Sequence, residues 1–122
     1  MNLCLLLGGK QVVYATTAFT LAWTHSVEKT RWEEDWRVTP HGLEIVEARV
    51  EGSGAGMEIP PDARFDGRTW HYRPDLPPQP EIVLARSGMA GGSWQLCFAG
   101  SCHDLLEKNG DAGSPAELSA CP

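Results

Sequence analysis

The residues with the clearest chemical potential are a histidine and a glutamate that fall among tryptophans. In the stretch from Phe19 to Val38, apolar side chains recur at every second position, which is the period of a strand with one buried face. His25 and Glu34 interrupt this series on its apolar side. Paired across a hairpin, they would bring an imidazole beside a carboxylate within an indole-walled surface, and each would perturb the titration of the other.

The position of the connecting loop along the chain decides which of these residues oppose one another. A four-residue loop spanning Glu28 to Arg31 pairs His25 with Glu34 and Trp23 with Trp36. Directly opposed residues in an antiparallel pair have Cβ atoms about 4.5–5.5 Å apart, so we expect His25 and Glu34 to touch. Such a pair serves either as a structural ion pair within the sheet or as part of a site, and the sequence favours neither.

A glycine-rich segment is the second unusual feature. It follows an expected strand from Leu43 to Glu51, whose charges fall on both faces and indicate an edge position. Two prolines come soon after the glycines, which argues against the strand, loop and helix of a dinucleotide site. Because glycine lets the backbone approach another surface closely, we interpret Gly54, Gly56 and Met57 as a loop laid over the indole cluster.

Catalytic patterns in the sequence are weak. Ser26 and Lys29 match the S-x-x-K nucleophile pattern, but on a strand the two side chains point to opposite faces. No nucleophile or oxyanion hole completes a general base made of His25 and Glu34. Non-enzymatic binding is therefore the favoured hypothesis, and a small hydrolase or isomerase that uses this dyad as general base is the alternative.

Composition and charge limit the partners. A net charge of -6 over 122 residues, with scattered Lys and Arg, argues against nucleic acid and anionic membrane surfaces. The sequence has no run of about 20 apolar residues that would span a bilayer, and its start lacks the features of a signal peptide. We expect a cytoplasmic protein by default, or a periplasmic one if an export signal was removed. No cofactor is expected, and exposed tryptophans leave a homo-oligomer open.

Short apolar runs separated by turn residues predict an all-β domain. Gly8-Gly9 and Asp66-Gly67 suit hairpin turns, and the spacing of such signals predicts about seven or eight strands. The expected architecture is a small antiparallel sandwich or partly closed barrel over residues 1–108. The polar, Gly-, Ala- and Pro-rich composition of residues 109–122 predicts a poorly ordered C-terminal tail, after a short helical turn at Asp104 to Lys108.

The four cysteines lack the paired spacing of zinc sites, and no metal site is expected. Cys97 and Cys102 flank a tight-turn sequence that could bring them within disulfide reach. Whether they are bonded depends on the redox compartment, which the sequence leaves open.

Four segments carry a resemblance to a known family: T-H-S-V-E-K-T, E-E-D-W, G-S-G-A-G-M and W-Q-L-C. They resemble a bacterial family known as domain-of-unknown-function family 1850, and the resemblance covers the chain from Leu3 to about Leu105. Members are commonly encoded beside, or fused to, permeases of the TRAP type with TAXI-class solute receptors. The resemblance therefore implies an accessory role in solute uptake, without an assigned mechanism. The signature positions that it implies are His25, Ser26, Val27, Glu28, Glu34, Gly54, Gly56 and Met57.

Together, the pattern and the resemblance define one expected ligand-binding surface. Its members are His25, Ser26, Glu28, Glu34, Trp23, Trp36, Gly54, Gly56 and Met57.

Overall fold

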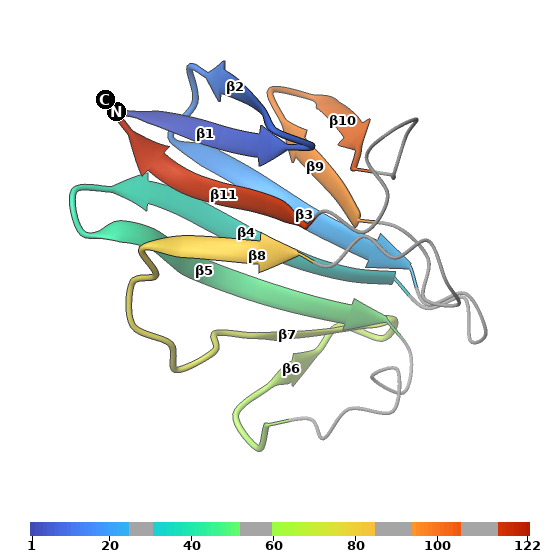
Figure 1. Cartoon of the computed structure of the whole chain (residues 1–122). Coiled ribbons are helices and arrows are strands. Elements are labelled where there is room, and N and C mark those ends of the chain that lie inside the picture. Colours follow the sequence, from blue (N-terminus) through green and yellow to red (C-terminus); the bar gives the residue numbers. More distant parts are fainter. Residues whose placement is uncertain (25–30, 52–59, 85–93, 106–114) are drawn as a thin grey trace.

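The chain forms two antiparallel β-sheets that stack face to face (Figure 1). The computed structural model describes residues 1–24, 31–51, 60–84, 94–105 and 115–122. Within these ranges there are eleven strands and no helix, so no described helix could cross a membrane. The expected all-β class is confirmed, as a sandwich and not as a closed barrel. The described residues form more strands than the seven or eight expected, because short edge strands and a C-terminal strand add to those that the sequence patterns indicate.

The smaller sheet has four strands in the order β2-β1-β11-β8. In that order they span Lys10–Tyr14, Asn2–Leu7, Ala116–Cys121 and Glu81–Leu84. Gly8 and Gly9 turn the chain from β1 into β2 with positive φ angles of 58° and 81°, as a two-residue hairpin turn requires. The observed register opposes Leu5 to Val12, as the sequence predicts.

The C-terminal strand β11 corrects the expectation of a poorly ordered tail. It lies between β1 and β8 and pairs with both along its length. Ala116 and Leu118 both point toward the other sheet and are fully buried, so their apolar side chains complete the core. A disulfide joins Cys121 to Cys4 on β1, with Cα atoms 5.9 Å apart. No local sequence pattern indicates this bond, because the two cysteines are 117 positions apart.

The larger sheet has seven strands in the order β10-β9-β3-β4-β5-β7-β6. In that order they span Ser101–Asp104, Trp94–Phe98, Ala18–Thr24, Arg31–Thr39, Gly42–Glu51, Thr69–Tyr72 and Arg64–Phe65. A turn at Pro40-His41 joins β4 to β5, and the expected turn at Asp66-Gly67 joins β6 to β7. Asp104 ends strand β10, which corrects the helical turn expected to begin there; residues 106–108 lie outside the described ranges.

Strand β5 is an interior strand and not the edge strand that its charges suggested. It pairs with β4 on one side and β7 on the other. A β-bulge at Val46 explains the difference, because Ile45 pairs with Trp36 while Glu47 pairs with Asp35. The extra residue reverses the alternation, so the charges on both sides of the bulge point to the same outer face of the sheet.

The core lies between the two sheets. From the larger sheet it takes the inward-facing side chains of β3, β4, β5 and β9, and from the smaller sheet those of β1, β8 and β11. Its fully buried leucines are Leu3, Leu21, Leu43, Leu96, Leu105 and Leu118. This packing fixes which face of each strand points inward, and it therefore decides where the candidate site residues lie.

Candidate functional site

Strand β4 presents different chemistry on its two faces, because side chains alternate along a strand. Trp36 is buried in the core at 5% exposure, and Trp32 and Glu34 share its inward-facing side. Glu33 and Asp35 point to the outer face of the larger sheet, where they form ion pairs. The W-E-E-D-W sequence thus places one carboxylate between two indoles and two carboxylates on the opposite face.

Glu34 is held by both neighbouring indole groups. The Nε1–H of Trp32 donates to its Oε2 and the Nε1–H of Trp36 donates to its Oε1, each at 3.2 Å. Each carboxylate oxygen accepts one of these bonds and keeps a further lone pair. Glu34 is partly exposed.

A row of tryptophans crosses the sheet beside Glu34. Trp94 on β9, Trp23 on β3 and Trp32 on β4 are directly opposed in the strand register. The rings of Trp94 and Trp23 are stacked, with centroids 6.3 Å apart. The row continues through Val50 on β5 to Trp70 on β7. All four tryptophans are partly exposed, in contrast to the buried Val50.

Tyr72 stands in the same row as Glu34, with the small side chain of Ala48 between them. Burial raises the pKa of the Tyr72 phenol, and the negative charge of Glu34 raises it further. The phenol therefore stays protonated and neutral near neutral pH, so Glu34 supplies the negative charge of this part of the surface.

The strand register differs from the one expected from the sequence. Glu34 opposes Leu21 and not His25, and Trp23 opposes Trp32 and not Trp36. The two strands are thus shifted by four residues, because the connection between Thr24 and Arg31 is centred two residues nearer the N-terminus than the expected loop from Glu28 to Arg31. An even shift keeps every side chain on its face, so Trp23, Glu34 and Trp36 still share the inner face.

The other predicted site residues are His25, Ser26, Glu28, Gly54, Gly56 and Met57, and they lie outside the described residues. The described strands do show where their segments are attached. The last residues of β3 and β5 and the first residue of β4 lie at one end of the larger sheet, since Thr24 pairs with Arg31 and Trp32 pairs with Val50. The tryptophan row lies at this same end.

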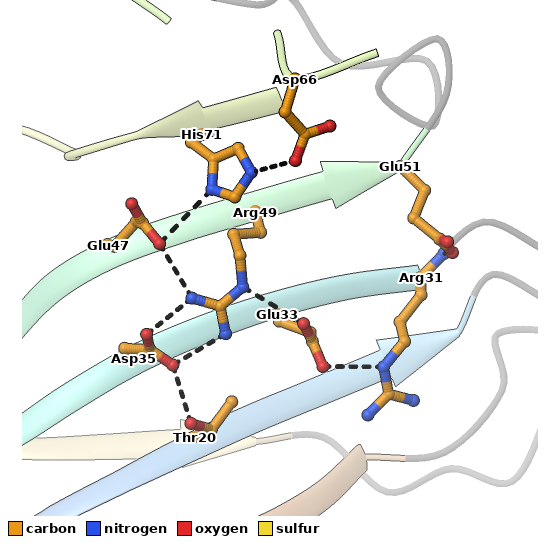
Figure 2. Close-up of polar contacts among 9 residues, drawn as sticks. All are labelled: Thr20, Arg31, Glu33, Asp35, Glu47, Arg49, Glu51, Asp66 and His71. Carbon is orange, nitrogen blue, oxygen red and sulfur yellow. Dashed lines mark hydrogen bonds and ion pairs between the residues drawn. The ribbon is translucent and has the colours of Figure 1, made fainter. Parts of the chain in front are cut away.

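The outer face of the larger sheet carries a charged network that the sequence analysis missed (Figure 2). Arg49 on β5 lies at its centre and donates to Glu33, Asp35 and Glu47. Asp35 also accepts a 2.7 Å hydrogen bond from the hydroxyl of Thr20. The hydrogen bond from Arg49 is the main cause that holds the pKa of Asp35 below its usual value. Charged residues at every second position of β4 and β5 could have indicated this network. The bulge at Val46 interrupts that pattern in β5, so a strict alternation assigns the charges there to both faces.

His71 extends this network to strand β7. Its side chain is 23% exposed and lies between Asp66 at 2.8 Å and Glu47 at 3.5 Å. The hydrogen bond to Asp66 raises the pKa of His71, and it lowers the pKa of Asp66 to about 2. The network spans β3 to β7 and is fully paired, so it ties these strands together on their solvent side.

A hollow of about 630 Å³ lies on the same outer face, beside the turn between β9 and β10. Thr20, Asp35 and Arg37 contribute to its lining, together with the disulfide between Cys97 and Cys102. That disulfide settles the pairing that the sequence left open, and it joins directly opposed residues. Glu34 and the row of tryptophans do not border this hollow, so the two features are separate.

Comparison with known proteins identifies the family of the chain. A family described as Domain of unknown function (DUF1850) matches residues 19–105. No curated protein and no solved structure gives a significant match. The matched segment contains Glu34 and the four tryptophans of the row, whereas β1, β2 and β11 lie outside it. Because the match covers well over half of the sequence, the chain belongs to the DUF1850 family.

Proposed function

We propose that this protein is a non-enzymatic accessory of a TRAP-type solute transporter, which holds a small ligand or docks on a transporter component through its tryptophan surface. We define the tryptophan surface as Glu34 with Trp23, Trp32, Trp70 and Trp94. The observation that carries the proposal is the fixing of the Glu34 carboxylate by two indole N–H groups at 3.2 Å. The link to a transporter comes from the gene neighbourhood that the family resemblance implies.

The geometry of Glu34 is suited to recognition. Its two hydrogen bonds fix the orientation of the carboxylate before any ligand arrives, which lowers the entropy cost of binding. The indole rings beside it supply a wide apolar surface with few rotatable bonds. Binding sites for small molecules commonly combine such an apolar lining with a few fixed polar groups.

The alternative of a hydrolase or isomerase has no geometric support among the described residues. It depends on His25 opposing Glu34 across the hairpin, and the observed register opposes Glu34 to Leu21. The groups that donate to Glu34 within the described residues are indole N–H groups, which donate hydrogen bonds but do not ionise near neutral pH.

The two disulfides support an oxidising compartment for this accessory. Cys4 bonds to Cys121 and Cys97 bonds to Cys102, so all four cysteines are paired. Such bonds persist in the periplasm and outside cells, and the cytosol reduces them. An extracytoplasmic location would place the protein where a solute receptor delivers its cargo.

The test is affinity purification from the native host, with mass spectrometry of the bound proteins and small molecules. Three forms are compared: the wild type, Glu34→Gln, and Glu33→Gln as a control on the opposite face of the same strand. We expect subunits of a TRAP-type transporter, or a stoichiometric small molecule, to be recovered with the wild type and Glu33→Gln and lost with Glu34→Gln. Recovery of neither from the wild type, or equal recovery with Glu34→Gln, would refute the proposal.

A further inference from the structure

Glu34 differs from the carboxylates of the charged network in the groups that contact it. Five acidic side chains of the outer face lie within 4 Å of a basic one: Glu33, Asp35 and Glu47 beside Arg49, Glu51 beside Arg68, and Asp66 beside His71. Within the described ranges, by contrast, Glu34 contacts two neutral indole donors and no basic side chain. Its negative charge is therefore oriented by the protein but not neutralised by a described residue.

The indole rings around this charge favour a positive ligand. The face of an indole ring carries partial negative charge, and tryptophan gives the strongest cation–π attraction among the aromatic side chains. Trp94, Trp23 and Trp32 place three such rings on adjacent strands, and all three are partly exposed. Glu34 is hydrogen-bonded to the last of them, so a cation bound at the row would lie close to indole rings and a carboxylate together.

The charge of the whole chain acts in the same direction. The net charge of -6 at pH 7 attracts cations toward the protein and slows the approach of anions. The negative charge of Glu34 would also repel an anionic ligand. A neutral sugar could stack on the rings, but it would gain nothing from the charge of Glu34.

We propose that the tryptophan surface binds a small organic cation, a quaternary or alkylated ammonium group, with Glu34 as its counter-ion. This inference rests on the proposed function, since it names the ligand class of the same surface. The methyl or methylene groups of such a cation pack on the indole rings, while its charge pairs with the carboxylate that Trp32 and Trp36 orient.

Choline and its neutral isostere 3,3-dimethylbutan-1-ol test this assignment on the unmodified protein. The two molecules have nearly the same shape and differ in charge, so their comparison does not depend on the folding of any variant. Binding is followed by tryptophan fluorescence and by isothermal titration calorimetry. We expect choline to bind at least about tenfold more tightly than the alcohol, and its affinity to fall as salt is added. Equal binding of the two, or no binding of choline, would overturn the assignment.

Variants then locate the binding site. Glu34→Gln should weaken choline binding at least about tenfold, whereas Glu33→Gln should leave it unchanged because Glu33 lies on the opposite face. Circular dichroism and urea unfolding verify that both variants are folded. Choline binding that is unaffected by Glu34→Gln would place the cation elsewhere and refute the inference.

This experiment separates the inference from the proposed function. If choline fails to bind while the wild type still retains a host molecule or transporter subunit that Glu34→Gln loses, the ligand class is wrong and the binding function stands. If Glu34→Gln retains everything that the wild type retains from the host, the proposed function fails, and the inference fails with it.

Discussion

The guanidinium of Arg49 and the carboxylate of Asp35 meet through two hydrogen bonds, Nη1 to Oδ2 at 2.6 Å and Nη2 to Oδ1 at 2.9 Å. This forked geometry requires the planar guanidinium group, and lysine cannot reproduce it. The same guanidinium donates to Glu33 and Glu47, so one cation compensates three carboxylates on two neighbouring strands. Without it, these carboxylates would repel one another across the centre of the larger sheet.

We expect Arg49→Met to lower the free energy of unfolding by about 1.5–3 kcal/mol, the range for lost hydrogen bonds to charged groups. Arg49→Lys should recover part of this loss, and Arg37→Met, at an exposed position of β4, should change little. Arg49 lowers the pKa of Asp35. The stability that the pair of Arg49 and Asp35 contributes is therefore present above pH 3.8 and is lost as the pH falls further. Urea unfolding at several pH values measures both effects.

The contact between His71 and Asp66 predicts a pH window of extra stability. The pKa of His71 is raised, so its contribution is complete below the unfolded value of 6.5 and is lost as the pH rises through the folded value. The pKa of Asp66 is lowered to about 2, so its contribution is present above 3.8 and is lost as the pH falls toward 2. The contact therefore stabilises the fold most between pH 3.8 and pH 6.5.

The variant His71→Gln should accordingly be less stable than the wild type within this window. Above the folded pKa of His71, the two proteins should have nearly the same stability. The measurement is the urea midpoint from pH 3 to pH 9 or so. His41→Gln is the matched control, because His41 is exposed in the turn between β4 and β5. A stability difference for His71→Gln that does not change with pH would contradict this account.

Gly42 occupies a position that no other residue can fill without strain. Its φ angle is +121°, and an added Cβ would lie 2.5 Å from the carbonyl oxygen of Gln79. That carbonyl accepts a 2.8 Å hydrogen bond from the amide of Leu43, so it is not free to move. We expect Gly42→Ala to cost about 3 kcal/mol or more, since backbone strain and the steric overlap add.

Gly9→Ala is the comparison for this prediction. Gly9 also has a positive φ, +81°, but nothing lies within 4 Å of an added Cβ. Only the conformational strain remains, about 1–2 kcal/mol. Thermal and urea unfolding of the two variants measure the difference, and equal losses would show that the contact with Gln79 has no energetic weight.

The two disulfides should differ in their effect on stability. The bond between Cys4 and Cys121 closes a separation of 117 residues, and the bond between Cys97 and Cys102 closes one of 5. Loop-closure entropy predicts about 5 kcal/mol for the long loop and about 2 kcal/mol for the short one. Replacing each pair by alanines and comparing unfolding free energies checks this order, and a larger loss for the short loop would contradict it.

Local sequence patterns were sufficient to predict that Trp23, Glu34 and Trp36 share one face, but not which residues lie opposite them. Alternation along β3 and β4 placed Trp23, Glu34 and Trp36 on one face, and an error of four residues in the register leaves that unchanged. The register depends on where along the chain the connection is centred, and no turn signal in residues 25–30 fixes that position. The opposition of His25 and Glu34 was wrong for this reason.

Long-range features were also beyond the sequence patterns. Strand β11 consists mostly of small and polar residues, and it becomes a strand by pairing with β1 and β8. The bulge at Val46 has no sequence signal of its own, yet it decides that Glu47 and Arg49 join the outer network. Each of these features depends on a partner strand.

The central place of β11 has a consequence for the time course of folding. Among the described strands of the smaller sheet, β8 pairs only with β11, which follows it in the sequence. Until β11 has been synthesised, β8 therefore lacks this partner. We expect the sandwich to assemble only after β11 has left the ribosome, and slowly, because its decisive contacts join distant parts of the sequence.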